Sequence, residues 1–369
     1  MTSKTIALLD GDGIGPEIMA EAVKLLKVVS ARNNIDFDLQ HSPFGAAAYF
    51  SDGDSFPTAT KNLCDKADAI LKGPIGLGHE ESKKIPIDMQ PERGALLPLR
   101  RRYNTYANFR PVVLPQSLSH FSPLKKEIIG NGIDIIIIRE LVGGLYFGKK
   151  ETGIDKNGKR FVREALEYDE DQIFAIAKVA FETATKRKKV LHNIHKSNVL
   201  KSSVLWNEII DEVNQDYPDV TVVNILVDAA ATYLCLNPGQ FDVMVMENMF
   251  GDILSDQAGG ILGSLGLMPS ACVGPEKAYY EPSHGSAPDI AGQGIANPYS
   301  MIGSVAMMLE MSFGMVKEAA NVWMAMQAVF AQGHSTPDLS KSTDEVKLIT
   351  TSAFGDLVAS ELQKIPRVS

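Results

Sequence analysis

The chain has little cysteine. Among its 369 residues only three are cysteines, Cys64, Cys235 and Cys272, and no two of them form a Cys-x-x-Cys pair. An odd number of widely spaced thiols excludes a disulfide framework and a zinc centre built from cysteines. Free thiols of this kind are typical of proteins in a reducing compartment.

The chain also lacks an excess of positive charge and lacks long apolar runs. Its formal net charge is −9, whereas nucleic-acid binding needs a basic face, so we expect no nucleic-acid partner. No apolar run approaches the length of a membrane span, and the N-terminus enters a strand-like run without the features of a signal peptide. We therefore expect a cytoplasmic protein that has no membrane partner.

What the chain does contain is an alternation of two kinds of apolar segment. Continuous runs rich in branched residues predict strands that are covered on both faces, and segments with helical periodicity separate them. This alternation predicts an α/β protein, and the chain length favours two domains. The expected strands are residues 5–9, 67–73, 133–140, 188–196, 220–228 and 241–247, and the expected helices are 15–33, 170–187, 197–215, 300–311 and 318–333.

A glycine-rich turn follows the first expected strand. Gly11, Gly13 and Gly15 precede Pro16, whereas the dinucleotide-binding fingerprint of a Rossmann domain places its third glycine one residue later. Pro16 suits the first turn of the helix that follows. The residues alone leave two possibilities open, a tight strand-to-helix turn or a contact with a cofactor.

Three acidic residues could bind a divalent cation. Asp252 and Asp256 are four apart in a helical pattern and therefore face the same way, while Asp228 ends an apolar run. Carboxylate oxygens suit Mg²⁺ or Mn²⁺. The alternative is that Asp252 caps a helix and that Asp256 is merely solvated.

Several cations stand where anions could be bound. Arg100, Arg110 and Arg139 can each hold a carboxylate with two hydrogen bonds. Arg139 ends an apolar strand, where an unpaired charge is costly, so we expect a protein or ligand anion beside it. Lys196 ends another apolar run, and Ser197 or Asn198 is expected to cap the next helix.

Residues 281–298 form a long loop rich in Gly, Pro, Ser and Asn. Loops of this length in compact domains are usually functional. Its backbone amides and His284 could enclose a nucleotide, and Asp289 could bind a ribose diol. A carboxylate at that position repels a 2′-phosphate, which favours NAD over NADP.

Taken together, these stretches resemble the β-decarboxylating dehydrogenases of the isocitrate/isopropylmalate dehydrogenase family. The motifs, in the order of the family, are GDGIGPE, LRRRY…YANFRP, RELVGGLYFG, KSNVL, NMFGDILSD and EPSHGSAPDIAGQGIANP. The resemblance implies a two-domain isopropylmalate/isocitrate dehydrogenase-like α/β fold that is not a Rossmann fold. It also implies a cofactor-binding domain at 1–106 plus 263–369, and a substrate, metal and dimerisation domain at 107–262 with a β-arm at about 148–171.

The resemblance further implies a role for each candidate residue in a homodimer with shared active sites. Lys196 removes the proton of the substrate hydroxyl, and Tyr146 protonates the enol. The substrate is bound by Arg100, Arg110, Arg139 and Asp228, and Mg²⁺ or Mn²⁺ by Asp228, Asp252 and Asp256. NAD is bound by Ile14, Asn198, His284, Gly285, Ser286, Ala287, Asp289 and Asn297.

The residues before Arg100 bear on the substrate. Leu96, Leu97 and Val199 can bury an isopropyl group but cannot satisfy a carboxylate. We therefore expect NAD-dependent oxidative decarboxylation of (2R,3S)-3-isopropylmalate to 4-methyl-2-oxopentanoate and CO₂, a step of leucine biosynthesis. Two alternatives remain open. One is homoisocitrate or another 3-substituted malate, because Arg93 could pair with an extra carboxylate, and the other is a non-catalytic ligand-binding subunit.

Overall fold

The computed structural model describes residues 3–342 and 346–367. The chain divides into two compact units, which are described here one at a time. The first unit comprises Met1–Asn104, Ser117–Pro123 and Leu262–Ser369, and the second comprises Thr105–Gln116 and Leu124–Ile261. The boundaries expected from the sequence, at 106/107 and 262/263, miss the return of Ser117–Pro123 to the first unit.

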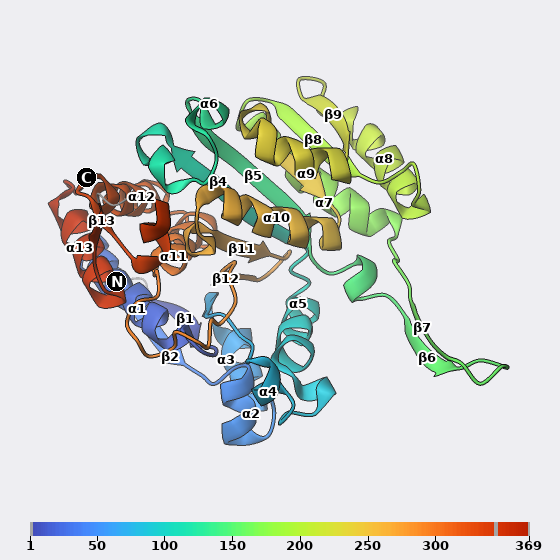
Figure 1. Cartoon of the computed structure of the whole chain (residues 1–369). Helices are drawn as coiled ribbons and strands as arrows, with labels where there is room; N and C mark the ends of the chain where they lie inside the picture. Colours follow the sequence, from blue (N-terminus) through green and yellow to red (C-terminus); the bar gives the residue numbers. More distant parts are fainter. Residues whose placement is uncertain (1–2, 343–345, 368–369) are drawn as a thin grey trace. The chain divides into compact units, whose positions relative to one another are not determined.

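The first unit is built on a five-stranded layer in the order β2-β1-β3-β12-β11 (Figure 1). Its pairings are parallel except for the antiparallel pair of β11 and β12. The strands are β1 (Ser3–Leu9), β2 (Asp36–His41), β3 (Ala69–Lys72), β11 (Pro269–Val273) and β12 (Ala278–Pro282). The hydrophobic side chains of β1 and β3 are buried, as expected for strands that helices cover.

The helices of the first unit come from both ends of the chain. Helix α1 begins at Gly15, with Pro16 in its first turn, and ends before Asn34 in the left-handed conformation. The others are α2 (Ala46–Asp52), α3 (Thr58–Lys66), α4 (His79–Ser82), α5 (Leu97–Tyr103), α11 (Tyr299–Met311), α12 (Val316–Ala331) and α13 (Thr351–Lys364). A π-helical turn, Pro91–Leu96, leads into α5, and two short strands, β13 (His334–Ser335) and β14 (Lys347–Leu348), pair with each other.

The second unit has its own five-stranded layer, in the order β4-β5-β10-β8-β9. Strand β4 is antiparallel to β5, and the remaining pairs are parallel. Its strands are β4 (Ala107–Pro115), β5 (Gly132–Glu140), β8 (Val190–His195), β9 (Thr221–Leu226) and β10 (Val243–Met246), and its helices are α6 (Lys126–Ile129), α7 (Glu170–Thr185), α8 (Lys201–Asn214), α9 (Val227–Leu236) and α10 (Asn248–Leu262). Helices α7 and α8 pack on β5, β8 and β10 to form the core of this unit.

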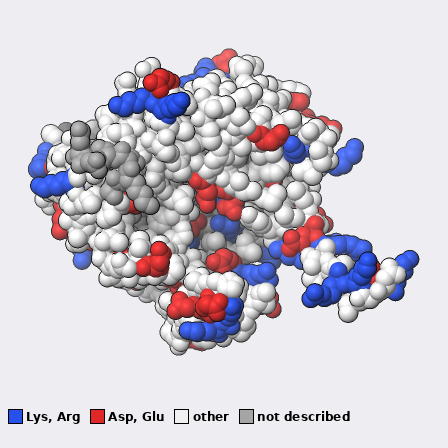
Figure 2. All heavy atoms as spheres, viewed as in Figure 1, with Lys and Arg blue, Asp and Glu red and all other residues white. Residues whose placement is uncertain are grey.

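A two-stranded ribbon projects from the second unit in Figure 1. It consists of β6 (Lys150–Ile154) and β7 (Arg160–Glu164), which pair in antiparallel fashion. Ile154 and Val162 are 70% and 69% exposed. Figure 2 shows Lys and Arg side chains along the ribbon. The ribbon occupies the segment where the sequence predicts a β-arm, and its function in a dimer stays a prediction.

The structure corrects two local expectations in the second unit. Strand β9 ends at Leu226, so Asp228 lies in the first turn of α9, and β9 is an exposed edge strand instead of a doubly covered one. Neither Ser197 nor Asn198 caps α8, which begins at Lys201. The amides of Val199 and Leu200 instead donate to the carbonyl of Lys196, which makes a separate turn before the helix.

No helix within residues 3–342 and 346–367 combines the length and the apolarity that a membrane crossing requires.

Candidate active site

A guanidinium, a carboxylate and a phenol meet at the end of β5 in the second unit. The buried Arg139 donates from Nη1 to Asp252 Oδ1 at 2.5 Å, and from Nη2 to Asn248 Oδ1 at 2.7 Å. The other carboxylate oxygen of Asp252 accepts a hydrogen bond from the Tyr146 hydroxyl at 2.8 Å. Asp252 is thus the anion that the position of Arg139 predicts, and it also holds Tyr146.

The phenol of Tyr146 is poised as a proton donor. Burial raises the pKa of Tyr146 to about 12, and the carboxylate of Asp252 adds to this effect. A phenol with that pKa keeps its proton at neutral pH. It can therefore supply a proton during a reaction without being ionised beforehand.

A second arginine holds the second aspartate of α10. Arg110, on β4, donates to Asn108 Oδ1 at 2.8 Å, to Ser255 Oγ at 2.6 Å and to Asp256 Oδ1 at 3.3 Å. Burial raises the pKa of the Asp256 carboxyl, and Arg110 opposes that rise. Because Asp256 follows Asp252 by one helical turn, both carboxylates lie on one face of α10, each beside a guanidinium.

These two carboxylates provide hard oxygen donors of the type that Mg²⁺ and Mn²⁺ accept. Within residues 3–342 and 346–367 of one chain, however, no three His, Cys, Asp or Glu side chains converge as a metal-binding group. A complete site of the expected composition therefore needs a donor beyond this pair.

Asp228 is engaged elsewhere in the same chain. Its Oδ1 accepts a hydrogen bond of 2.5 Å from Lys196 Nζ, which joins the end of β8 to the first turn of α9. This hydrogen bond lowers the pKa of the Asp228 carboxyl. The Asp228 side chain is 65% exposed, so the pair is open to solvent or to a second molecule.

The remaining candidates for substrate binding divide between the two units. Arg100 belongs to the first unit, where it is buried, donates to the Tyr279 hydroxyl at 3.1 Å and lies 4.0 Å from Glu281 Oε1. These partners of Arg100 were not predicted from the sequence. Leu96 ends the π-helical turn and Leu97 opens α5, both half-buried, whereas Val199 is in the second unit and is 70% exposed.

A cavity of about 450 Å³ lies within the first unit, where the sequence predicts cofactor contacts. Of the predicted residues, Ile14, His284, Gly285, Ala287 and Asn297 line it. Ile290, Ile295 and Ala296 also line it and belong to the predicted loop 281–298, although they were not named as contacts. The lining residues from outside that loop that were not predicted are Ser264, Leu265, Gly266, Pro337 and Asp338. Ser286 and Asp289 are absent from this lining in the described part of the chain, and Asn198 belongs to the second unit.

His284 supplies an unused polar atom at this cavity. Its Nδ1 contacts the carbonyl oxygen of Gly285 at 2.8 Å, while the buried Nε2 has no hydrogen-bond partner among the described residues. Burial lowers the pKa of His284, so the imidazole is neutral near pH 7. Apolar walls with an orphaned ring nitrogen fit a nucleoside, which presents a flat apolar base edged by polar atoms.

The glycine-rich turn at residues 11–15 packs against Ser286, in the loop that lines this cavity. Gly13 has a φ of 56°, and a Cβ there would lie 2.0 Å from the carbonyl oxygen of Ser286. The Ile14 amide donates to that same carbonyl at 2.8 Å. The buried Asp12 carboxylate accepts from the amides of Ala46, Ala47 and Gly76. The stretch is thus a tight strand-to-helix turn whose Ile14 side chain reaches the cavity.

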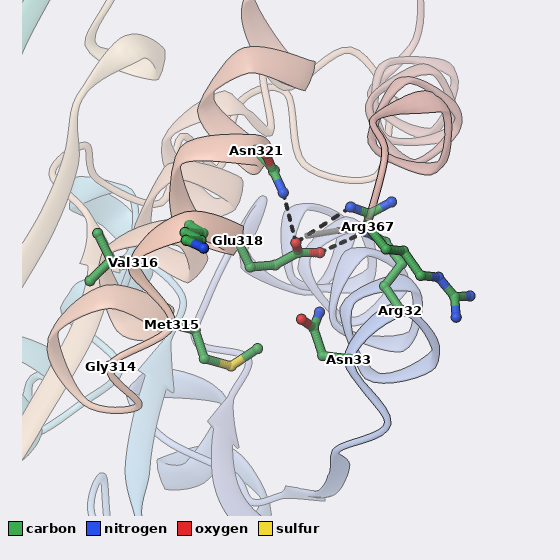
Figure 3. Close-up of a pocket in the computed structure, with 9 residues that line it drawn as sticks. Arg32, Asn33, Gly314, Met315, Val316, Glu318, Asn321 and Arg367 are labelled. Atoms are coloured by element: carbon green, nitrogen blue, oxygen red, sulfur yellow. Dashed lines mark hydrogen bonds and ion pairs between the residues drawn. The ribbon is translucent and has the colours of Figure 1, made fainter. Parts of the chain in front are cut away.

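A second cavity of the first unit, of about 420 Å³, contains none of the predicted site residues (Figure 3). Its buried charges satisfy each other, because Arg32 Nε donates to Glu318 Oε1 at 2.7 Å and Asn321 donates to Glu318 Oε2 at 2.9 Å. We therefore regard it as a structural feature.

Two α/β units, one with a largely apolar cavity and the other with arginine–carboxylate pairs, suit an enzyme that binds a nucleotide and an anionic substrate. Residues 5–358 match the model of the isocitrate/isopropylmalate dehydrogenase family, and the chain belongs to that family. The fold is accordingly the family's α/β fold, as the motifs predicted.

Similar proteins extend over the full length of the chain. The 3-isopropylmalate dehydrogenase of Geobacter sulfurreducens is 46% identical and aligns over 97% of this chain and 98% of its own length. That of Thermotoga maritima is 45% identical, over 98% and 99%. Among solved structures, isocitrate dehydrogenase from Methylococcus capsulatus has a TM-score of 0.84 at 31% identity, covering 98% of this chain and 100% of that one. A β-decarboxylating dehydrogenase from Thermococcus kodakarensis has a TM-score of 0.77 at 30% identity, over 98% and 96%.

Proposed function

We propose that this protein is a 3-isopropylmalate dehydrogenase that oxidises (2R,3S)-3-isopropylmalate to 4-methyl-2-oxopentanoate and CO₂ with NAD, as a step of leucine biosynthesis in the cytoplasm. The observation that carries the substrate is the full-length similarity, at 43–46% identity, to proteins of that name. The contacts among Arg139, Asp252 and Tyr146 support the chemistry.

The arginines bind the substrate, and the aspartates bind the metal. Arg100, Arg110 and Arg139 hold the two carboxylates of the substrate, since a guanidinium binds a carboxylate with two parallel hydrogen bonds. Asp252 and Asp256, with Asp228 supplied by a second copy of the chain, would hold Mg²⁺ or Mn²⁺. When bound, the metal acts as a Lewis acid that stabilises negative charge on the substrate oxygen after CO₂ leaves.

Two side chains move protons. Lys196 accepts the proton of the C2 hydroxyl, and bound NAD would supply the hydride acceptor for the oxidation. After decarboxylation Tyr146 gives its proton to the carbon that has lost CO₂. The hydrogen bond of Tyr146 to Asp252 orients the phenol, and its raised pKa keeps the proton in place until that step.

The cavity of the first unit is where we place the adenosine of NAD. Its support is the apolar lining and the orphaned Nε2 of His284. His284, Gly285, Ala287, Asn297 and Ile14 contact the adenosine; Ser286 and Asp289 bind it from the same loop. Asn198 lies near the nicotinamide.

We assign substrate preference to the apolar side chains that the sequence predicts beside the third carbon of the substrate. Leu96, Leu97 and Val199 bury the isopropyl group, a contribution of about 2 kcal/mol for a side chain of that size. A carboxylate placed against the same leucines loses its hydration without gaining a partner, so tricarboxylic substrates are disfavoured.

Steady-state kinetics with 3-isopropylmalate, homoisocitrate, isocitrate and D-malate test the proposal. Each is assayed with NAD or NADP and with Mg²⁺ or Mn²⁺, and formation of reduced cofactor is followed by absorbance. We expect the highest kcat/KM for 3-isopropylmalate with NAD. A higher value for homoisocitrate would assign the alternative substrate. Absence of turnover with all four acids would support a non-catalytic ligand-binding subunit.

A further inference from the structure

Two buried carboxyl groups of the second unit have no part in the proposed reaction. Glu140 is fully buried at the end of β5, and Glu247 is 6% exposed just before α10. The hydroxyl of Tyr168 lies between them, 2.9 Å from Glu140 Oε2 and 3.4 Å from Glu247 Oε2. Burying two carboxyl groups beside one phenol costs free energy, which hydrogen bonds to these groups must offset.

Each carboxyl fixes a stretch of backbone that leads to a catalytic group. Glu140 accepts from the amides of Val142 and Gly143, which shapes the turn that leads to Tyr146. Glu247 accepts from the amides of Met249 and Phe250, at 3.1 Å each, and so caps the first turn of α10.

Tyr168 connects these two stretches directly. Its hydroxyl accepts a hydrogen bond of 3.0 Å from the Asn248 amide, the first residue of α10. The Asn248 side chain in turn donates to the Gly143 carbonyl at 3.0 Å and accepts from Arg139. The phenol therefore touches both the start of the helix and the carboxyl that shapes the turn.

The ring of Tyr168 is held rigidly by close packing. A Cβ at Gly143 would lie 2.5 Å from its Cε1, and a Cβ at Gly144 would lie 2.7 Å from its hydroxyl oxygen. On another side Trp206 meets the ring edge to face, with centroids 5.7 Å apart. Two glycines in succession thus let the turn lie flat on this ring.

We infer that Tyr168 is a positioning residue, which holds the turn of Tyr146 against the N-terminus of α10 and thereby sets the contact between Tyr146 and Asp252. This inference rests on the proposed function, because Tyr146 and Asp252 are the groups that it aligns. Tyr168 acts on these two groups indirectly. Its effect reaches them through Glu140, Glu247 and Asn248.

The test is Tyr168→Phe, which keeps the ring and removes the hydroxyl. We expect kcat with 3-isopropylmalate to fall about tenfold or more, since small displacements of catalytic groups are costly. The Mn²⁺ concentration for half-maximal activity should rise, because α10 carries Asp252 and Asp256. The KM for NAD should stay unchanged, since the cofactor cavity is lined by the first unit.

The matched control is Tyr217→Phe. Tyr217 stacks on Phe181 in the same unit, with centroids 5.2 Å apart, and its hydroxyl has no hydrogen bond among the described residues. This variant should retain wild-type kinetics. If Tyr168→Phe also keeps the wild-type kcat and Mn²⁺ dependence, the inference is overturned, and it is equally overturned if KM for NAD rises in step with the loss of kcat.

If Tyr168→Phe does not fold, a second variant tests the positioning role of Tyr168. Glu140→Gln keeps an acceptor for the turn but replaces one carboxylate oxygen by an amide group. We expect the same selective loss of kcat and Mn²⁺ activation, and wild-type values for this variant would refute the inference. Inactivity of the wild-type protein with all four acids would instead refute the proposed function, so the two failures are distinguishable.

Discussion

At the residue scale, Gly251 shows how closely the site is packed. It lies on α10 one residue before Asp252, and a Cβ there would be 2.4 Å from Cγ of the buried Arg139. Any larger residue must displace the guanidinium that holds Asp252. A glycine in the middle of a helix lowers its stability, and here this cost permits the approach of helix and arginine.

We predict that Gly251→Ala destabilises the protein by about 1–3 kcal/mol, the usual cost of overpacking a core. Because Arg139 must move away from Asp252, kcat/KM should fall at least about tenfold. Urea unfolding and steady-state kinetics measure the two effects.

The control for this variant is Gly260→Ala on the same helix. Nothing lies within 4 Å of a Cβ at Gly260, so the alanine should stabilise α10 by about 0.5–1 kcal/mol and leave turnover intact. If Gly251→Ala and Gly260→Ala have the same free energy of unfolding and the same kcat/KM, the close contact between Gly251 and Arg139 affects neither stability nor turnover.

Asp289 carries a second prediction at this scale. Its carboxylate is expected to bind the ribose diol of NAD and to repel the 2′-phosphate of NADP. Asp289→Lys should therefore weaken NAD binding and shift the ratio of kcat/KM values toward NADP, by about tenfold or more, since it replaces repulsion of the phosphate by attraction. The control Glu276→Lys makes the same charge change at an exposed turn of the first unit. An unaltered cofactor ratio in Asp289→Lys would remove Asp289 from the ribose site.

At the scale of elements, a buried ion pair joins α1 to α12. Arg32 near the end of α1 donates to Glu318 in the first turn of α12 (Figure 3). Arg32 also donates to the carbonyl of Ile365 at 2.9 Å, just after α13. Both charged side chains are less than 10% exposed. Breaking such a pair by removing one charge leaves the other one buried and unpaired.

The variant Glu318→Gln should lower the free energy of unfolding at pH 7 by about 3 kcal/mol. Burial favours the neutral acid, but hydrogen bonds from Arg32 and Asn321 outweigh it and hold the pKa of Glu318 below its usual value. The stabilisation is therefore fully present above the carboxyl pKa of the unfolded chain, about 4.3, and is lost as the pH falls through the lower folded pKa.

Urea unfolding between pH 7 and pH 3 tests this dependence. The stability curves of wild type and Glu318→Gln should converge at the acid end, while Glu310→Gln, at an exposed carboxyl, should follow the wild type throughout. A constant gap between wild type and Glu318→Gln at all pH values would show that the carboxylate charge is not what stabilises the contact.

Element prediction from the sequence succeeded where the pattern was long and complete. Residues 15–33 were expected to be a helix, and α1 has those bounds, because a proline at the start and a left-handed Asn34 at the end delimit its apolar face. Element prediction was less accurate where tertiary contacts determine the secondary structure. The strands β2, β4, β11 and β12 were not predicted, since their apolar residues are few or are interrupted by proline and charged residues, and Asp228 lies in a helix that starts one residue earlier.

At the scale of the whole molecule, the proposed metal site needs a second chain to supply its third acidic side chain. In one chain Asp228 binds Lys196, while Asp252 and Asp256 bind Arg139 and Arg110. Large apolar side chains of the second unit are also exposed, namely Tyr233 and Leu236 on α9 and Ile253 on α10. Exposed apolar residues on neighbouring elements are typical of association surfaces, which supports the proposed homodimer.

Complementation between inactive variants tests the shared site. Lys196→Met and Asp256→Asn should each fall below about 1% of wild-type activity, because each removes a group that the chemistry needs. After subunit exchange, mixed dimers regain one complete site each, so an equal mixture should recover up to about a quarter of wild-type activity.

The control mixture combines Lys196→Met with Asp228→Asn. Both changes affect the contribution to the neighbouring site, so no mixed dimer regains a complete site and activity should stay low. Recovery in this control would place Lys196 and Asp228 of one site on different chains, and no recovery in the test mixture would place Lys196 and Asp256 of one site on the same chain.

The sequence by itself determined the family and the α/β class, and it supplied the residues for which chemical roles are proposed, because ordered motifs of Gly, Arg, Asp and Lys are written directly in the chain. It could not determine which side chains touch. Three such contacts join segments far apart in the chain: Arg139 binds Asp252, Arg100 is buried against Tyr279, and Asp338 and Leu265 line the cavity of the first unit. Tertiary packing sets such distances, because the local preferences of each segment do not specify which distant segment it will meet.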